Sequence, residues 1–395
     1  MKIVHICLAG LYMSGWGYQD NMLAKYHKLE GHEVSVIAND YVYDEKGNYE
    51  KLKAPFTNPS YDINGVAIYR LKQKGNKQVT GPAMRVHYLG LYECLTSISP
   101  DIIFLHNPQI LDVDDIVKYI KNANNSVKLY VDSHSDYSNS GRNFLSKHIL
   151  HGIIWRSKVK KLIPYAERFY GVLPARVDFL LDRYKTPKEK TCLLCMGMDT
   201  ELANKAADEA VIKEIRNKYN INDDDFFLIT GGKIDHAKKQ TLLLMEAITK
   251  IDNPHVKLLI FGSIVDDMKE EFNRLLKKAN ENSERIIYIG WLDADDTYPY
   301  FAASDFAIFP GRHSVMWEQV AGQGIPMAVK YWEGTTHVDL GGNVVFLKKD
   351  SADEIRELIE KLMNKGNEYK ALKLAAMEKG PKHFSYKDIA HNCIN

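Results

Sequence analysis

The sequence has few cysteines, almost no net charge and no long apolar run. Its five cysteines in 395 residues form an odd and sparse set, which argues against a disulfide framework. The formal net charge is +1, from 52 basic and 51 acidic residues. This balance argues against nucleic-acid binding, which requires a strongly basic surface. No apolar run reaches the roughly 18 residues of a membrane-spanning helix.

The first residues also lack the features of a signal peptide. Met1-Lys-Ile-Val-His-Ile-Cys-Leu8 has neither a long apolar region nor a cleavage site of small residues, so we expect a cytoplasmic protein. A length of 395 residues exceeds one typical hydrophobic core, and two domains are expected. Cys192 and Cys195 form a C-x-x-C pair. With only leucines between them and no second pair nearby, they are more typical of buried strand residues than of a zinc or redox site.

The stretch 309–326 organises the second half of the chain. The apolar run 306–309 ends in Pro-Gly and an amphipathic segment opens at Ser314, which predicts a strand, a loop and a helix with Ser314 as N-cap. Free amides and the helix dipole make such a turn an anion site, typical of phosphate binding at the carboxyl edge of a parallel sheet. Glu318 and Gln319 are predicted to bind hydroxyl groups of the phosphate's carrier. The alternative is an ordinary strand-to-helix connection with a solvated Glu318.

The first half opens with a βαβ pattern. Residues 2–9 read as a buried strand, 21–29 as a helix and 31–38 as a second strand. The loop before the helix contains Gly15 and Gly17. These glycines allow a ligand to approach the backbone closely, although their spacing is not that of the dinucleotide fingerprint.

Two histidines follow predicted strands in the first half. His106 ends the apolar run 100–106, and His134 follows the run 127–131. Because carboxyl ends of parallel strands share one edge of a sheet, both histidines are predicted at a ligand site, with a structural role as the alternative for each. Neither belongs to a tight His/Asp cluster, so we do not predict metal ligands.

A helix is expected over 82–97.

The segment 142–161 mixes basic and apolar side chains. Lysines and arginines alternate there with isoleucines, leucines and Trp155. This composition is typical of a helix that lies on an anionic membrane surface. The alternative is a helix that packs on its own domain and exposes its basic side to water.

The second half repeats the α/β alternation after a charged linker, 201–225. A strand over 226–230 leads into Gly231-Gly-Lys-Ile-Asp-His-Ala-Lys238. Lys233 and Lys238, beside a predicted helix start, are predicted to clamp a diphosphate, with ordinary surface charge as the alternative.

Later strands in this half lead to further candidate positions at the same edge. One strand ends at Gly262 and Ser263, and another leads to Leu292. Since successive parallel strands present their carboxyl ends together, these positions should join the lysines at one ligand site.

In this half the sequence resembles the retaining glycosyltransferases of family four. Gly232-Lys233 and Lys238 hold the spacing of that family's nucleotide-binding signature, with lysine in place of arginine. The resemblance implies an α/β fold of the GT-B type, in which two Rossmann-like domains with parallel sheets face a cleft. It implies an acceptor domain over 1–199, joined by a C-terminal helix at 384–395, and a donor domain over 200–383.

The family's Glu-x7-Glu motif is matched less closely. In the family, this motif is followed by a glycine and a proline, which correspond here to Gly324 and Pro326. Counting back from these two residues places Gln319 at the second glutamate and Gly311 at the first. A shift of one residue places Glu318 at the second position instead. The resemblance therefore implies that Glu318 or Gln319 holds the donor ribose, and that His313 or Arg312 replaces the first glutamate at the sugar.

The first half resembles the family more loosely. Gly17-Tyr-Gln19, with Gly15 before it, is similar to the glycine loop whose amides reach the donor phosphate and whose glutamine touches the acceptor. His134 matches the family's histidine near the reacting sugar. His106 ends a strand similar to the family's Pro-Asp-hydrophobic-His strand, and we expect it near the acceptor.

The resemblance also implies how the donor is held. Lys233 and Lys238 would supply cations to the diphosphate, and Ser314 and Val315 would supply amides. The remaining donor contacts are expected from backbone groups at Gly232, Gly262, Ser263 and Leu292. These groups remove the need for a metal ion, so no cofactor is expected beyond the nucleotide sugar.

The sequence thus predicts a retaining, metal-independent hexosyl- or N-acetylhexosaminyltransferase of a bacterial cell-surface polysaccharide pathway. It would move a sugar from a uridine diphosphate donor to a glycan or lipid-linked acceptor, with peripheral membrane contact through 142–161. Two alternatives stay open. One is a catalytically silent subunit that binds sugar nucleotides, and the other is a nucleotide-sugar epimerase of the same fold.

Overall fold

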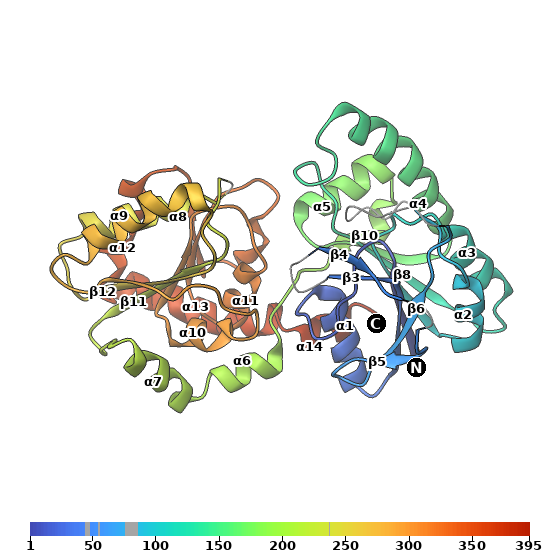
Figure 1. Cartoon of the computed structure of the whole chain (residues 1–395), viewed down its shortest axis with the longest axis horizontal. Coiled ribbons are helices and arrows are strands. Elements are labelled where there is room, and N and C mark those ends of the chain that lie inside the picture. The colour runs from blue at the N-terminus through green and yellow to red at the C-terminus, as the bar shows by residue number, and fades with distance from the viewer. Residues whose placement is uncertain (44–47, 54–55, 76–85, 237) are drawn as a thin grey trace. The chain divides into compact units, whose positions relative to one another are not determined.

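The computed structural model describes residues 1–43, 48–53, 56–75, 86–236 and 238–395. The chain divides into two compact units (Figure 1). The first comprises Met1–Cys195 together with Ile389–Asn395, and the second comprises Met196–Asp388. The C-terminal residues therefore return to the first unit.

The first unit is built on an eight-stranded sheet with the strand order β10-β9-β8-β7-β1-β2-β6-β5. All neighbours are parallel except β5 and β6. Its strands are β1 Lys2–Cys7, β2 Glu33–Asn39, β5 Ser60–Tyr61, β6 Ala67–Leu71, β7 Ile102–His106, β8 Lys128–Ser133, β9 Ala166–Gly171 and β10 Thr191–Leu193, with a separate antiparallel pair, β3 Tyr41–Tyr43 and β4 Tyr49–Lys51. Its helices are α1 Gln19–Leu29, α2 Leu91–Ile98, α3 Val113–Asn122, η1 Leu145–Trp155, α4 Arg156–Leu162, α5 Pro174–Phe179, η2 Leu180–Tyr184 and η3 Lys188–Lys190.

The second unit is built on a six-stranded, wholly parallel sheet with the order β13-β12-β11-β14-β15-β16. Its strands are β11 Phe226–Gly231, β12 Val256–Phe261, β13 Ile286–Tyr288, β14 Phe306–Phe309, β15 Met327–Lys330 and β16 Val344–Leu347. Its helices are α6 Thr200–Ala206, α7 Glu209–Lys218, α8 Gln240–Lys250, η4 Asp266–Met268, α9 Lys269–Ala279, α10 Thr297–Ala303, α11 Met316–Gly322, η5 Thr336–Val338, α12 Ala352–Leu362 and α13 Asn367–His383; α14 Tyr386–Asn392 runs across the boundary between the units.

The central strands are largely apolar and buried, as expected of parallel sheets with both faces covered. Ile3, Val4 and Ile6 of β1 are fully buried, as are Phe227, Leu228 and Ile229 of β11. In the second unit α8, α9 and α12 pack together over one face (Figure 1). The prediction of an α/β fold with parallel sheets is confirmed. Among the described residues, every helix is too short or too polar to span a bilayer.

Two predicted segments differ in the structure. The expected charged linker over 201–225 is largely helical, because α6 and α7 are short amphipathic helices capped by Asp199 and Asp208. The expected helix over 82–97 is shorter: α2 begins only at Leu91, after Gly90 in the left-handed conformation. Residues 82–85 of that prediction lie outside the described residues. The two cysteines were predicted as buried strand residues; Cys192 lies in β10 but is only partly buried, and Cys195 is buried just beyond that strand.

Candidate functional site

The carboxyl ends of β11 and β12 approach each other through glycines in the second unit. A Cβ atom on Gly262 would lie 2.0 Å from the carbonyl oxygen of Gly232, and one on Gly231 would lie 2.1 Å from the Phe261 ring. Gly232 and Gly262 have φ angles of +112° and +123°, which side chains rarely adopt. The glycines therefore let the two strand ends touch, and they bring the backbone to the rim of a pocket.

This pocket lies at the ends of the neighbouring strands β11 and β14. It is lined by Thr230, Gly231, Lys238, Thr241, Phe309, Pro310, Gly311, Arg312, Ser314 and Trp317. Two residues of the predicted donor site, Lys238 and Ser314, thus come together. Burial lowers the pKa of the Lys238 amine, with an opposing contribution from Asp235. Lys233, its predicted partner, is exposed and does not line the pocket.

The start of α11 differs from the prediction. We predicted Ser314 as the N-cap, but the helix begins at Met316 and its N-cap is Val315, without a side-chain cap hydrogen bond. Trp317 N donates to Ser314 O at 2.9 Å, so a turn precedes the helix. The Trp317 indole Nε1 is buried without a hydrogen-bond partner among the described residues. Trp317 is also one of the residues that line the pocket, and it was not among the residues predicted from the sequence.

Glu318 is fully buried between two histidines. Its Oε1 accepts from His313 Nε2 at 2.8 Å and from His337 Nε2 at 2.7 Å. Burial alone would raise the pKa of Glu318, but the charges and hydrogen bonds of the histidines outweigh it and lower the pKa to about 2. Its Oε2 has no hydrogen-bond partner within the described residues. The expected alternative of a solvated Glu318 is wrong.

The same three side chains have the composition of a metal site. One ligand atom from each of His313, Glu318 and His337 lies within 4.8 Å of the others. The carboxylate and imidazoles would suit a divalent transition metal. Without an ion, two N–H groups share Glu318 Oε1, while Glu318 Oε2 and His337 Nδ1 have no partner among the described residues.

The other predicted donor residues of the second unit lie at nearby strand ends. Gln319 is 6 % exposed on α11. Ser263 follows β12 and is exposed, and Leu292 lies in the loop after β13. Gly262 N donates to Gly290 O at 2.6 Å, and Gly262 O accepts from the Tyr288 hydroxyl at 2.8 Å. These bonds join the loops that follow β12 and β13.

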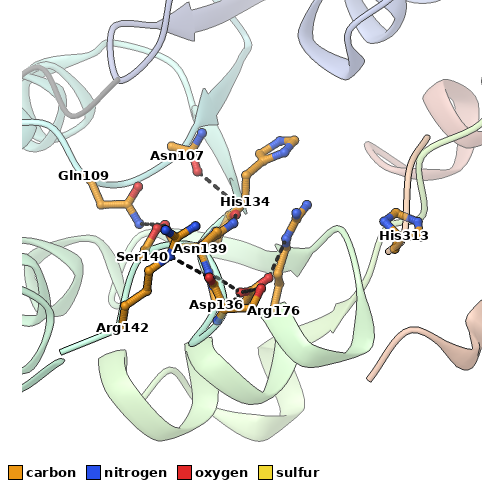
Figure 2. Close-up of polar contacts among 12 residues, drawn as sticks. Asn107, Gln109, His134, Asp136, Asn139, Ser140, Arg142, Arg176 and His313 are labelled. Carbon is orange, nitrogen blue, oxygen red and sulfur yellow. Dashed lines mark hydrogen bonds and ion pairs between the residues drawn. The ribbon is translucent and has the colours of Figure 1, made fainter. Parts of the chain in front are cut away.

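In the first unit, His134 opens a loop that is held by its own side chains (Figure 2). Asp136 Oδ1 accepts from the backbone N–H groups of Ser138 and Asn139, at 2.7 and 3.0 Å. Asn139 Nδ2 donates to His134 O at 2.7 Å, and His134 N donates to Asn107 Oδ1 at 2.8 Å. The loop therefore holds His134 in place while its side chain stays 33 % exposed.

A cation from the next strand end joins this loop. Arg176 lies on α5, directly after β9, and its Nε donates to Asp136 Oδ2 at 3.3 Å. A Cβ atom on Gly171 would lie 2.3 Å from Val177 N, so α5 packs tightly against the end of β9. Figure 2 shows Arg176 and His134 on the same side of the loop. Arg176 was not predicted as a site residue, although its position two residues after Pro174 was the available signal.

His134 also approaches a buried carboxylate. Asp132 accepts from His106 Nδ1 at 2.6 Å through Oδ2 and from Asn107 N at 3.0 Å through Oδ1, and its Oδ1 lies 3.7 Å from His134 Nε2. Burial would raise the pKa of Asp132, but the two histidines outweigh it, and the pKa lies well below its usual range. Asp132 is therefore an anion beside His134.

His106 belongs to a chain of buried histidines. His106 Nε2 lies 2.9 Å from His5 Nδ1, and His5 Nε2 lies 3.1 Å from His27 Nδ1. At the far end, His27 Nε2 lies 2.9 Å from the carbonyl oxygen of Ala390, which only accepts.

The hydrogen-bond directions in this chain follow from that carbonyl. Burial lowers the pKa of His27 to about 4 and that of His5 well below its usual value, so both are neutral at pH 7. His27 donates to Ala390, His5 donates to His27, and His106 donates to His5. Since His106 also faces the Asp132 anion, it carries protons on both nitrogens. Its pKa is correspondingly raised, because Asp132 outweighs the effect of burial.

This geometry bears on the predicted acceptor role of His106. The side chain is 4 % exposed and both of its nitrogens have partners. His106 and His134 do lie at one sheet edge, because β7 and β8 are parallel neighbours with His106 opposite Asp132. The contact of His106 with an acceptor stays a prediction; its observed contacts are with Asp132 and His5.

The glycine loop precedes α1 at the same sheet edge. Gly15 has a φ angle of +79°, and Gly17 has open space where a Cβ would stand. Gln19 opens α1, is 3 % exposed and has no hydrogen-bond partner for either side-chain atom among the described residues. Burial raises the pKa of the adjacent Asp20, and the charges of His106 and His134 oppose that shift. Asp20 is a second residue near His134 that the sequence analysis missed.

Comparisons with known proteins place these features in context. Residues 211–379, within the second unit, match the family described as glycosyl transferases group 1. No curated protein matches the sequence.

Solved structures are similar along the whole chain. A glycosyltransferase from Rickettsia africae has 14 % identity and a TM-score of 0.66, covering 100 % of this chain and 96 % of the other. HepE from Anabaena, solved with UDP, has 15 % identity and a TM-score of 0.65, covering 100 % and 98 %. A structure described as trehalose-6-phosphate from E. coli bound with UDP-2-fluoro glucose has 11 % identity and a TM-score of 0.65, covering 99 % and 97 %.

These structures share the GT-B fold of two Rossmann-like domains, and the chain has that fold. The fold predicted from the sequence is confirmed at this level. The matched region is thus similar to group 1 glycosyl transferases, and the whole chain shares its fold with solved GT-B structures.

Proposed function

We propose that the protein transfers a hexose or N-acetylhexosamine from a uridine diphosphate donor to a glycan or lipid-linked acceptor, with retention at the anomeric carbon and without a metal ion. The observation that carries this proposal is the pocket at the ends of β11 and β14. It combines the Lys238 amine, glycine backbone and the turn before α11. Similar structures solved with UDP or UDP-2-fluoro glucose support the choice of donor.

The pocket suits a diphosphate for three reasons. Lys238 provides a cation, and burial of its amine keeps that charge poorly screened by water. Gly231 and Gly232 allow the diphosphate to approach the backbone. The buried Trp317 Nε1, which has no partner among the described residues, is proposed as a third donor to the diphosphate. Lys233, exposed after Gly232, is proposed to reach the diphosphate from outside the pocket.

The rest of the donor is assigned to neighbouring strand ends. Gly262, Ser263 and Leu292 are proposed to hold the base. Glu318 is proposed to hold the ribose through Oε2, which lacks a partner among the described residues, while His313 lies beside it for the sugar. Gln319 is the alternative for the ribose. Ser314 and Val315 are proposed to give amides to the phosphates from the turn before α11.

The chemistry follows from the charge that develops on the leaving group. As the glycosidic bond breaks, negative charge grows on the diphosphate, so a fixed cation and N–H donors stabilise the transition state more than the bound donor. His134, held beside the Asp132 anion, is proposed to contact the transferred sugar, and Gln19 to contact the acceptor. Gly15 and Gly17 are proposed to present their loop to the donor phosphate. Front-face attack, assisted by the donor phosphate, is the proposed route to retention.

A silent sugar-nucleotide-binding subunit is the second candidate. It is favoured by Gln319 at the place of the family's second glutamate. Incubation with a panel of nucleotide sugars, with and without an acceptor mixture, separates the candidates. Release of nucleoside diphosphate supports transfer, whereas binding without release supports the silent subunit. An altered sugar on an intact nucleotide indicates an epimerase.

Lys238→Ala tests the pocket itself. If one preorganised donor to the leaving group is lost, kcat/KM falls by roughly 10²-fold or more. The matched control is Lys239→Ala, because Lys239 is the exposed neighbour of Lys238 and does not line the pocket. Equal turnover by Lys238→Ala and Lys239→Ala would remove Lys238 from the diphosphate site.

A chelator tests whether His313, Glu318 and His337 work without a metal ion. We expect EDTA to leave turnover unchanged, since the two histidines already satisfy Glu318 Oε1. Activity that disappears with EDTA and returns with one divalent cation would contradict metal independence and assign the ion to this cluster.

A further inference from the structure

The segment η1, with the residues beside it, exposes a cluster of large apolar side chains on the first unit. Phe144, Leu145, Ile149, Ile153 and Ile154 are 71 %, 69 %, 43 %, 60 % and 43 % exposed. Their spacing of four and five residues matches a helix whose hydrogen bonds run from i to i+5, so they lie along one side of it. Single exposed apolar residues are ordinary, but a contiguous group marks an interaction surface.

The opposite side of the segment is already packed. Trp155, Val159 and Leu162 are buried in the core of the first unit. His151 Nδ1 lies 2.8 Å from the Tyr184 hydroxyl, and the His151 ring meets the Phe179 ring edge to face. Packing on its own domain therefore accounts for these residues, but it leaves the apolar cluster uncovered among the described residues.

The charged side chains along this segment of the sequence have one sign. From Tyr137 to Ala166 the sequence contains six lysines and arginines and no acidic residue. Lys158 and Lys161 both contact Asp114. The other four are Arg142, Lys147, Arg156 and Lys160, and no acidic partner is recorded for them within the described residues. Since the whole chain carries a net charge of only +1, this concentration is local.

We infer that these apolar and basic side chains, termed here the η1 surface, dock the protein on an anionic lipid bilayer. Large aliphatic and aromatic side chains enter the boundary between headgroups and acyl chains, while lysines and arginines bind anionic headgroups. A bilayer is favoured over an acidic protein because the apolar group is as prominent as the charge, and both lie along one helical segment.

The η1 surface also follows directly from the His134 loop. Arg142 Nε donates to Ser138 O at 2.7 Å, and the Ser146 hydroxyl donates to Ser140 O. Figure 2 shows Arg142 and Ser140 in the same loop region as His134 and Asp136. If the proposed transfer is correct, docking delivers a lipid-linked acceptor to His134. This second step rests on the proposed function, whereas the docking itself does not.

Vesicle sedimentation with the full chain tests the docking. We expect the protein to pellet with vesicles of phosphatidylcholine and phosphatidylglycerol and to stay in solution with phosphatidylcholine alone. Raising the salt concentration should release it, because headgroup attraction is screened. Equal partition into both vesicles, or into neither, would overturn the inference.

Variants assign the binding to the η1 surface. Leu145→Ser with Ile153→Ser should weaken vesicle binding by about tenfold or more, because two side chains leave the acyl boundary. The control pair is Leu374→Ser with Met377→Ser, whose side chains are 58 % and 57 % exposed on α13. A loss of binding shared by both pairs would contradict the assignment.

Charge variants provide a second measurement that does not alter apolar surface. Lys147→Gln with Arg156→Gln should weaken binding to anionic vesicles several-fold and reduce its salt dependence. Lys370→Gln with Lys373→Gln, at exposed positions on α13, is the control. The inference fails if Leu145→Ser lowers the sedimentation coefficient from that of a dimer to that of a monomer while every variant binds vesicles as the wild type does. In that case a second copy of the chain covers the η1 surface.

The two proposals fail separately. Vesicle binding without nucleotide release from any donor supports docking and contradicts the proposed function. Transfer to a soluble acceptor, with no vesicle binding by the wild type, contradicts docking alone.

Discussion

Each unit contains a fully buried carboxylate held between two histidines, one more exposed than the other. In the first unit Asp132 lies between His106 and His134, and in the second unit Glu318 lies between His313 and His337. The two carboxylates differ in how their oxygens are used. Asp132 has hydrogen bonds to both oxygens, whereas Glu318 receives both of its hydrogen bonds on Oε1.

This difference indicates that Asp132 positions other side chains and that Glu318 binds a ligand. Asp132 has little capacity left for a ligand, and it holds His106 as a cation beside the exposed His134. Glu318 keeps a buried oxygen without a partner among the described residues, which is costly unless a ligand donates to it. We therefore expect Asp132 to act through His134 and Glu318 to bind a ligand directly.

Amide substitutions test the contrast and should have the largest effect. Asp132 accepts one hydrogen bond on each oxygen, so in Asp132→Asn the NH2 group must face either Asn107 N or His106 Nδ1, which are both donors. The substitution also removes the negative charge that pairs with the buried His106 cation. We expect a loss of roughly 3–5 kcal/mol in unfolding free energy. Glu318→Gln keeps the one acceptor that both histidines use, and a smaller loss of about 1–3 kcal/mol is expected.

Calorimetric unfolding of the whole chain compares these variants. Asp114→Asn is the control, since Asp114 is an exposed partner of two lysines and its ion pairs contribute at most about 1 kcal/mol. A larger loss for Glu318→Gln than for Asp132→Asn would reverse the interpretation of the two sites.

The histidine chain in the first unit has no counterpart around Glu318 within the described residues, and it gives that unit a pH dependence. An unfolded histidine titrates near pH 6.5, whereas burial lowers the pKa of His27 to about 4 in the folded protein. Between these values the unfolded chain binds a proton that the folded protein does not. Stability therefore falls as pH drops from 6.5 towards 4, and His27 alone contributes a loss on the order of 2 kcal/mol at pH 5.

His27→Gln removes that contribution. A glutamine amide can still donate to Ala390 O but cannot be protonated, so the variant should lose less stability between pH 7 and pH 5 than the wild type. Urea denaturation at the two pH values measures this. His148→Gln, at an exposed position, should follow the wild-type profile. If the wild type and His27→Gln lose the same unfolding free energy between pH 7 and pH 5, His27 does not take up a proton on unfolding in this range.

The exposed histidine of the first pair should have the smallest effect on stability. His134 is 33 % exposed and 3.7 Å from Asp132, so His134→Ala should change the unfolding free energy by less than about 1 kcal/mol. If it contacts the transferred sugar, kcat should still fall by about tenfold or more. Thermal unfolding and initial rates, measured on one preparation, separate the two effects. Unchanged kcat would remove His134 from the sugar site.

The sequence predicted the architecture because its strongest signals are local. Apolar runs separated by amphipathic segments predict parallel strands and helices, and strand ends place His106, His134 and Lys238 at sheet edges. Local charge misled the prediction at α6 and α7, where many charged residues on amphipathic helices resembled a linker. Ser314 has the composition of an N-cap, yet a turn extends past it to Val315.

The partners that define the two carboxylate sites were beyond local signals. His337 meets Glu318 from η5, which is 19 residues later in the chain, and His5 meets His106 across 101 residues. No spacing rule joins such positions, because their contact depends on strand order and on the path of a later loop. Asp20 was missed for the same reason, because it approaches His134 from the end of a different strand.

The return of residues 389–395 to the first unit has a consequence for biosynthesis. Tyr130 and Tyr170 donate their hydroxyls to the carbonyl oxygens of Ile394 and Cys393, at 2.9 and 2.8 Å, and His27 donates to Ala390. During translation these three groups lack their partners until the ribosome has synthesised the entire second unit. The unit that is made first is therefore completed last, and a nascent chain halted before residue 389 would leave buried donors of the first unit unsatisfied.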